Sequence, residues 1–268
     1  MNTKTKSILL WVGAFIFMAV IAIYQKMTGP TYPVRGKVEL GGETIKYKLL
    51  RTYETGTDAP IKIAVADTAI KGLCKYRRFK SYDEWTFAPM KREGGDLVAY
   101  LPMQPMAGKV MYEISLTKGT ETKLLNNDQV VLLRYKGIVP LYILIPHIIA
   151  MFLAMVFSTR AGLEAITKGA DAYKQALWTI IFLCIGGVIL GPLVQKYAFD
   201  VYWSGWPWGH DLTDDKTAVA VIAWVIAVVR LKNHPERRTW ALIASLVLLA
   251  IYLIPHSALG SEIDYTKQ

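Results

Sequence analysis

The chain has 268 residues, of which 53% are hydrophobic, and a formal net charge of +10 at pH 7. Long apolar blocks exclude an ordinary soluble protein and indicate an integral membrane protein. The positive charge is scattered through strand-like sequence instead of being gathered in one basic stretch, so nucleic acid is not expected as a partner.

Five apolar blocks are long enough to suggest membrane crossings. A helix of about 20 residues spans a hydrocarbon layer of about 30 Å. The first three blocks meet or approach this length, and the last two would need flanking side chains that reach the interface. We therefore predict five transmembrane helices, at Ile8–Tyr24, Ile138–Ser158, Ala176–Val194, Thr217–Leu231 and Trp240–Pro255.

The distribution of lysine and arginine predicts the orientation of these helices. With the N-terminus inside, the inner segments hold nine basic residues, Arg160 among them, and the short outer segments hold three. Cytoplasmic segments collect Lys and Arg, so we expect the N-terminus in the cytoplasm and the C-terminus outside the cytoplasmic (inner) membrane. No small-residue cleavage site follows the first block, which is therefore predicted to be a retained signal anchor.

In the segment between the first two apolar blocks, apolar residues occur at alternate positions, as in a β-strand. Alternating apolar residues run into Gly41-Gly42 and resume after it, which is a hairpin signal. Eight or nine short strands with turn residues between them predict an extracytoplasmic, immunoglobulin-like or fibronectin-like β-sandwich. The expected domains are a signal anchor (1–26), the sandwich (27–136), a four-helix bundle (137–256) with an outer loop (195–215), and an extracytoplasmic tail (257–268).

Aromatic side chains of the sandwich are expected to form its core, namely Tyr76, Trp85, Tyr100 and Tyr112. The alternative is an exposed platform on which sugar rings stack. This segment contains no histidine and no cluster of carboxylates. A binding or spacer role is therefore preferred to catalysis, and no catalytic residue is assigned.

Two Ile-Pro-His tripeptides place His147 in the second apolar block and His256 at the end of the fifth. A proline in a helix frees carbonyl groups and bends the axis, so the next imidazole can turn into the bundle. Ionisable residues within a membrane are often functional. His210 and Asp211 follow in the outer loop, and together the four residues form a candidate metal or haem site.

The outer loop is dense in aromatic residues, a pattern typical of the membrane interface. The alternative is a lid that carries His210 and Asp211 over a cavity in the outer leaflet. Directly after the loop, Thr213 is predicted to be a helix N-cap with Asp214 and Asp215 in the first turn, and metal ligation by either acid is the alternative. The aromatic residues are Tyr197, Phe199, Tyr202, Trp203, Trp206 and Trp208.

The favoured hypothesis is a non-enzymatic membrane protein that presents a basic β-sandwich at the outer face, as a subunit or scaffold of an envelope complex. Its expected partners are membrane lipids and one or more proteins that bind the sandwich. The alternative is a metal or haem redox protein, or a lipid-handling protein, with an outer-leaflet site around His147, His210 and His256.

Overall fold

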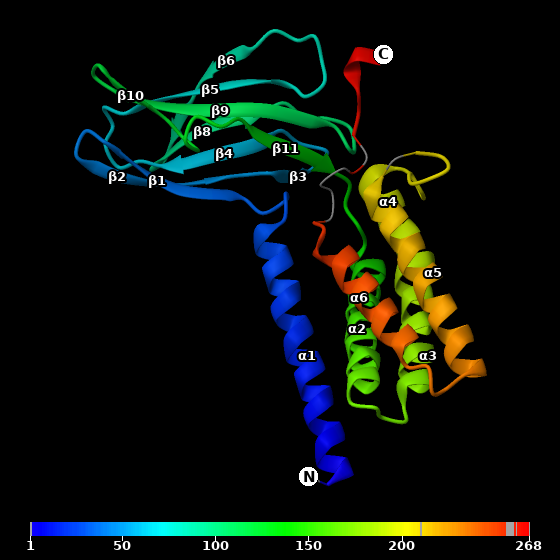
Figure 1. Cartoon of the computed structure of the whole chain (residues 1–268). Helices are drawn as coiled ribbons and strands as arrows, with labels where there is room; N and C mark the ends of the chain where they lie inside the picture. The colour runs from blue at the N-terminus through cyan, green and yellow to red at the C-terminus, as the bar shows by residue number, and fades with distance from the viewer. Residues whose placement is uncertain (1, 210, 256–259, 261, 268) are drawn as a thin grey trace. The chain divides into compact units, whose positions relative to one another are not determined.

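The computed structural model describes residues 2–209, 211–255, 260 and 262–267. The chain divides into two compact units (Figure 1). The helical unit contains Met1–Pro30 and Val139–Gly260, and the β unit contains Thr31–Ile138 and Ser261–Gln268. The last residues of the chain therefore belong to the β unit, although they follow the final helix in sequence.

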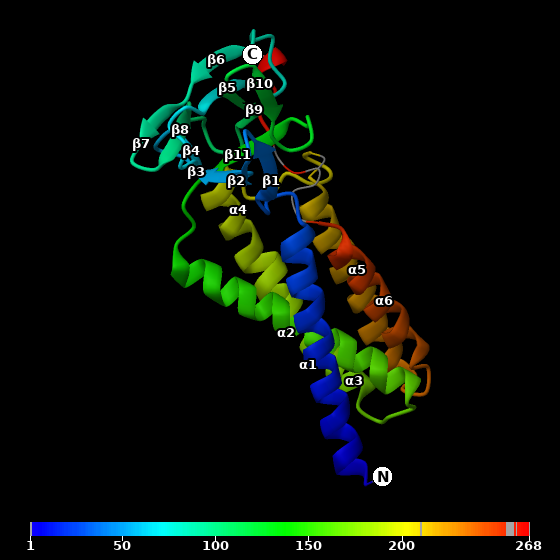
Figure 2. The same cartoon turned by 90° about the vertical axis from the view of Figure 1, so that its left-hand side faces the viewer.

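Among its described residues, the helical unit has six α-helices and one π-helical segment. Figure 2 labels the α-helices. The side chain of Asn2 caps the first helix by accepting a hydrogen bond from the Lys4 backbone N–H at 3.2 Å. The second begins directly after Pro140, which lacks the N–H that a helix start leaves unpaired. The elements are α1 (Thr3–Thr28), α2 (Leu141–Ile166), α3 (Ala172–Leu183), the π-helical η1 (Cys184–Leu190), α4 (Gly191–Phe199), α5 (Leu212–Asn233) and α6 (Thr239–Leu253).

Small side chains lie between the helices, and large apolar side chains face outward. Ala154, Ala161, Ala176, Ala241 and Ala244 are almost completely buried. Many larger residues are exposed along the same helices, including Phe15 of α1 and Ile222 of α5. This arrangement is typical of a membrane protein, because small residues let helix backbones approach closely while large apolar residues meet lipid.

Three helical segments are long and apolar enough to cross a membrane: Lys4–Thr28, Leu141–Ile166 and the continuous stretch Ala172–Phe199. The other two expected crossings do not meet this criterion in the described chain. The apolar helix α6 has only 15 residues, and α5 carries two acids in its first turn and two basic residues in its last. By length and composition, three of the described helical segments are candidates for membrane crossing, where five were expected.

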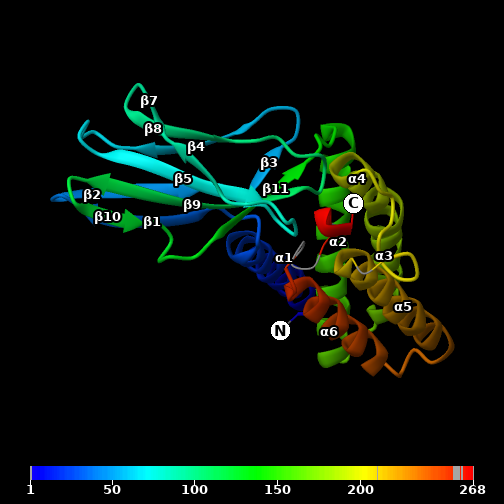
Figure 3. The ribbon, with the colours of Figure 1, turned by 90° about the horizontal axis from the view of Figure 1, so that it is seen from above.

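Eleven strands lie among the described residues of the β unit, in three hydrogen-bonded sheets whose pairings are mostly antiparallel. Figure 3 shows many of these strands lying along roughly one axis. The hairpin β1–β2 forms one sheet, the order β3-β11-β9-β5-β6 with β10 beside β9 forms the second, and β4-β8-β7 forms the third. The strands are β1 (Val34–Leu40), β2 (Glu43–Leu49), β3 (Thr52–Glu54), β4 (Ala59–Ala64), β5 (Lys71–Arg78), β6 (Thr86–Pro89), β7 (Lys91–Glu93), β8 (Asp96–Leu101), β9 (Lys109–Lys118), β10 (Glu121–Leu124) and β11 (Val131–Lys136).

One apolar core joins residues from all three sheets. Strand β9 alternates buried and half-buried residues along most of its length, as a strand with one face on the core must. A β-rich unit is thus established, but the strand pairing does not by itself assign it to the immunoglobulin or fibronectin class. The expected glycine turn is present, with Gly41 and Gly42 both at positive φ between β1 and β2.

The aromatic residues of the core differ in part from those expected. Tyr112 is completely buried as predicted, whereas Tyr100 is 47% exposed and Trp85 is half-buried. Tyr135, which was not predicted, is completely buried. Its hydroxyl donates to the Leu101 carbonyl at 2.8 Å and accepts from the Ala59 N–H at 3.2 Å. Alternation alone did not distinguish the two faces of each strand.

We expect the substitution Tyr135→Phe to lower the free energy of unfolding by about 1–3 kcal/mol, since it leaves a buried N–H and carbonyl without a partner. Burial raises the pKa of Tyr135 to about 12. The folded state therefore favours the neutral phenol, and its contribution is present below pH about 10 and lost as the pH rises toward about 12. Thermal unfolding of the full chain at pH 7 and pH 11 measures both effects. The substitution Tyr82→Phe, at a side chain that is 86% exposed, serves as control and should change little.

Candidate functional site

Two acids in the first turn of α5 hold the aromatic loop that precedes this helix. The Oδ2 atom of Asp214 accepts hydrogen bonds from the backbone N–H groups of Ser204 at 2.6 Å and Gly205 at 3.0 Å. The Oδ1 atom of Asp215 accepts from the Trp206 N–H at 2.7 Å. The side chain of Gln195 in α4 completes the cluster by donating to Ser204 Oγ at 2.7 Å and to Asp214 Oδ2 at 3.0 Å.

Glycines make this compact loop possible. A Cβ atom on Gly205 would lie 2.6 Å from both the Asp214 Cβ and the Asp215 Oδ1. A Cβ on Gly209 would lie 2.1 Å from the Ser204 carbonyl oxygen. The loop is thus folded onto the acids, and the tips of Trp206 and Trp208 remain 76% and 80% exposed.

The N-cap of α5 is Asp211 instead of Thr213. Its Oδ1 accepts a hydrogen bond from the Thr213 backbone N–H at 2.8 Å, so the helix starts two residues earlier than the predicted cap implies. Asp214 and Asp215 lie in the first turn as the sequence suggested. The sequence did not reveal that these acids also accept hydrogen bonds from N–H groups of the loop. An acid in the first turn suits the helix end and the loop equally, so its presence does not distinguish the two roles.

A buried lysine joins the end of α6 to the start of α5. Lys216 is 8% exposed, and its Nζ donates to the Ile254 carbonyl at 3.0 Å and to the Pro255 carbonyl at 3.4 Å. A cation near unpaired carbonyl groups at a helix C-terminus is favourable. The same lysine lines a small cavity of about 40 Å³ among α2, α3, α5 and α6, with room for about one water molecule.

We expect Asp214→Asn to loosen the aromatic loop, because it removes the charge from hydrogen bonds to two backbone N–H groups. The free energy of local opening should fall by about 2 kcal/mol. Chymotrypsin cleavage at the loop aromatics should therefore become roughly thirtyfold faster in the open-state-limited regime.

A matched control is Asp200→Asn, which removes the same charge from an exposed ion pair with Lys196. Asp200 has a left-handed backbone that asparagine also tolerates. Equal cleavage rates in the Asp214 and Asp200 variants would contradict the proposed role of the acids.

The predicted metal or haem site remains a prediction. His147 is half-buried in α2, and its Nδ1 lies 2.9 Å from the Gly186 carbonyl in the π-helical segment. His210 and His256 lie outside the described residues. Among the residues that are described, no three His, Cys, Asp or Glu side chains gather as metal ligands would. Asp211 accepts a hydrogen bond from the Thr213 N–H at the start of α5.

Arg160 lies inside the helical unit and not in an inner loop as the topology argument assumed. Helix α2 continues to Ile166, and Arg160 is only 1% exposed. It forms an ion pair with Glu164 at 2.6 Å, contacts Ser7 Oγ at 3.4 Å and faces the Trp11 ring at 5.5 Å. The spacing of four residues between Arg160 and Glu164 was the available signal. Without Arg160, the basic bias is still eight to three.

The outward face of β5 and β6 combines aromatic and basic side chains. The Trp85 ring lies 4.3 Å from Lys75 Nζ and 4.8 Å from Arg77 Cζ. Phe87 is 61% exposed and pairs with Lys75 across the two strands. Tyr82, in the segment before β6, is 86% exposed. We call Lys75, Arg77, Tyr82, Trp85 and Phe87 the β5–β6 surface.

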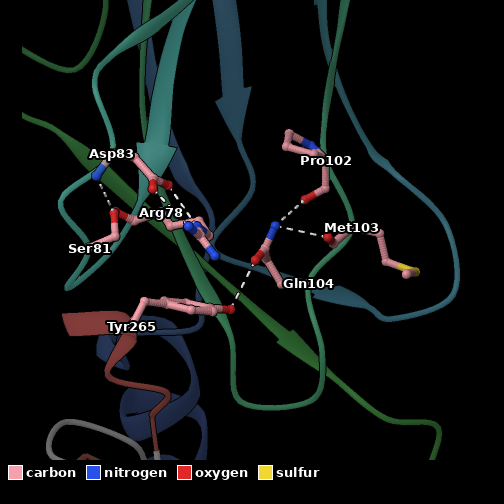
Figure 4. Close-up of polar contacts among 7 residues, drawn as sticks. All are labelled: Arg78, Ser81, Asp83, Pro102, Met103, Gln104 and Tyr265. Atoms are coloured by element: carbon pink, nitrogen blue, oxygen red, sulfur yellow. Dashed lines mark hydrogen bonds and ion pairs between the residues drawn. The ribbon is translucent and has the colours of Figure 1, made fainter. Parts of the chain in front are cut away.

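The C-terminal segment is bound to the β unit (Figure 4). The Tyr265 hydroxyl donates to Gln104 Oε1 at 2.9 Å, and the Gln104 amide is oriented by donating to the Pro102 and Met103 carbonyls. Arg78 lies over the Tyr265 ring at 4.4 Å while it pairs with Asp83 at 2.7 Å.

An ion-pair cluster reinforces this attachment. The Glu262 carboxylate binds both Lys80 and Lys109, which come from different parts of the β unit. Burial would raise the pKa of Glu262, but the hydrogen bonds from Lys109 and Lys80 outweigh it, and the pKa is lowered. Since the folded pKa is depressed, the attachment is favoured above the ordinary glutamate pKa of about 4.3 and weakens as the pH falls below it.

We expect Glu262→Gln to increase opening of the C-terminal segment roughly fivefold at pH 7. The difference between the variant and the natural chain should shrink as the pH falls through the lowered pKa of Glu262. Hydrogen exchange at residues 262–267 measures the opening. The exposed substitution Asp128→Asn in a loop of the same unit changes the charge equally and should leave this exchange unaltered.

No family model, no curated protein and no solved structure matches this chain.

Proposed function

We propose that the protein is a non-enzymatic membrane protein that docks a protein partner on its β unit. The observation that carries the proposal is the β5–β6 surface. Exposed aromatic side chains next to arginine are enriched where proteins bind one another, and they supply most of the binding free energy at such sites.

The position of this surface within its sheet supports the proposal. Strand β6 ends the strand order of its sheet, so its outer edge is unpaired among the described strands. It is only four residues long and contains Pro89, which limits uncontrolled pairing with other chains. A partner can therefore contact aromatic side chains and a short sheet edge at once.

The membrane arrangement that we propose has five crossings, with the N-terminus in the cytoplasm and the β unit and C-terminus outside the cytoplasmic membrane. The bias of basic residues favours this orientation. The short α6 and the charged ends of α5 fit crossings whose terminal side chains reach the interface. In this arrangement the exposed Trp206 and Trp208 lie at the outer interface of the membrane. The β unit is an immunoglobulin-like or fibronectin-like sandwich, and the protein acts as a subunit or scaffold of an envelope complex.

The double substitution Tyr82→Ala/Phe87→Ala tests the docking role. Both side chains are largely exposed, so the fold should be retained. A photoactivatable residue at Thr86, an exposed residue of β6 that lies between Tyr82 and Phe87 in sequence, should crosslink a stoichiometric partner in native membranes. We expect the double substitution to lower this yield at least tenfold, the effect of losing about 1.4 kcal/mol or more of binding free energy.

The control is Tyr100→Ala, which removes an exposed aromatic side chain from a different sheet of the same unit. Its crosslinking yield should equal that of the natural chain. Recovery of the chain alone, before and after crosslinking, would count against the proposed function, as would equal losses in the two variants.

A further inference from the structure

The β1–β2 hairpin carries four basic side chains on one exposed face. Arg35 lies directly across from Lys48, and Lys37 lies directly across from Lys46. All four are exposed, while the alternate residues of both strands turn toward the core. Side chains directly opposite each other in an antiparallel pair are about 5 Å apart, so each pair brings two positive charges together.

The charge of this face is only partly offset within the described part of the chain. None of the four basic residues forms an ion pair with a described carboxylate. Arg35 lies over the Tyr32 ring at 5.7 Å. The face also carries Glu39, which pairs across with Thr44 next to the turn, at the end of the hairpin away from Arg35 and Lys48.

The basic end of the hairpin is also the end that is connected to a membrane-crossing candidate. Helix α1 ends at Thr28 and β1 begins at Val34. Arg35 is the seventh residue after Thr28, so its backbone lies within about 25 Å of the helix end. Negative lipid headgroups lie where a crossing helix leaves the hydrocarbon layer.

We propose that this face of the hairpin binds the phosphate groups of anionic lipids. The bound anions would neutralise two like-charged pairs that otherwise repel each other across the strands. This contact is independent of the β5–β6 surface, which lies on other strands and combines charge with exposed aromatic rings.

The test uses the full chain in nanodiscs of phosphatidylcholine, with or without phosphatidylglycerol. A fluorophore attached through Thr44→Cys reports on the same face, two residues from Lys46 along β2. Lipids with a quencher on the headgroup are added in trace amounts. The unsubstituted chain, treated with the same reagent, corrects for labelling of Cys184, while Cys74 is buried.

We expect quenching to increase at least twofold when phosphatidylglycerol is present. The variant Lys37→Gln/Lys46→Gln/Lys48→Gln should lose most of this increase. The matched control Lys62→Gln/Lys71→Gln/Lys91→Gln removes three exposed lysines from other strands of the β unit and should keep it. Raising the salt from about 0.1 M to about 1 M shortens the screening length from about 10 Å to about 3 Å and should also abolish the increase.

Equal quenching in both lipid compositions would overturn the proposal, and so would equal losses in the two triple variants. Soluble poly-glutamate provides a further arm. If it bound the hairpin face while lipid composition had no effect, the face would recognise an acidic protein and the lipid proposal would be wrong. None of these outcomes depends on crosslinking at the β5–β6 surface.

Discussion

The β unit is inserted between two helices that are candidates for membrane crossing, and this constraint of chain connectivity underlies the rest of the molecule. The chain enters the unit after α1, leaves it before α2, and returns to it after α6. The first two connections have five and four residues, and after the return Glu262 and Tyr265 bind the rest of the unit through noncovalent contacts. The unit is therefore linked through short connections to two helices that are candidates for membrane crossing.

In the helical unit, helix formation pairs the backbone polar groups, and small residues allow the helices to pack closely. The buried polar side chains of this unit therefore need separate explanations. Lys216 pairs with carbonyl groups at the end of α6, and Asp214 pairs with N–H groups of a loop. Arg160 and Glu164 neutralise one another, although some of their polar atoms have no hydrogen-bond partner among the described residues. The first two interactions attach a helix end and a loop to the start of α5, which is a structural role. Burying Arg160 and Glu164 has a larger cost in desolvation free energy, because only close pairing offsets the removal of two charges from water.

The positions of the helices and of the first hairpin could be predicted from patterns among neighbouring residues in the sequence. Continuous apolar blocks located the helices, and alternation with a glycine pair located the first hairpin, because both signals depend on neighbouring residues alone. The acids before α5 were also recognised as first-turn residues. Their contacts with Ser204 and Gly205 depend on how the loop turns back, which sequence spacing does not specify. The attachment of Glu262 to Lys80 and Lys109 joins segments more than 150 residues apart, and no local pattern indicates it.

The two exposed basic regions of the β unit differ in a way that bears on their roles. On the β5–β6 surface, Lys75 and Arg77 lie over the Trp85 ring, and Lys75 also forms an ion pair with Glu113. Their positive charge is therefore partly neutralised within the protein. The surrounding aromatic area favours a close, desolvated contact with a shaped surface. On the hairpin, the cations face one another and form no ion pair with a described carboxylate, although Glu39 lies on the same face, so the proposed attraction is electrostatic, long in range and sensitive to salt. The proposed partners differ accordingly: a shaped protein surface for the first region and a diffuse anionic surface for the second. The two proposed contacts therefore rest on different physics and use separate strands of one unit.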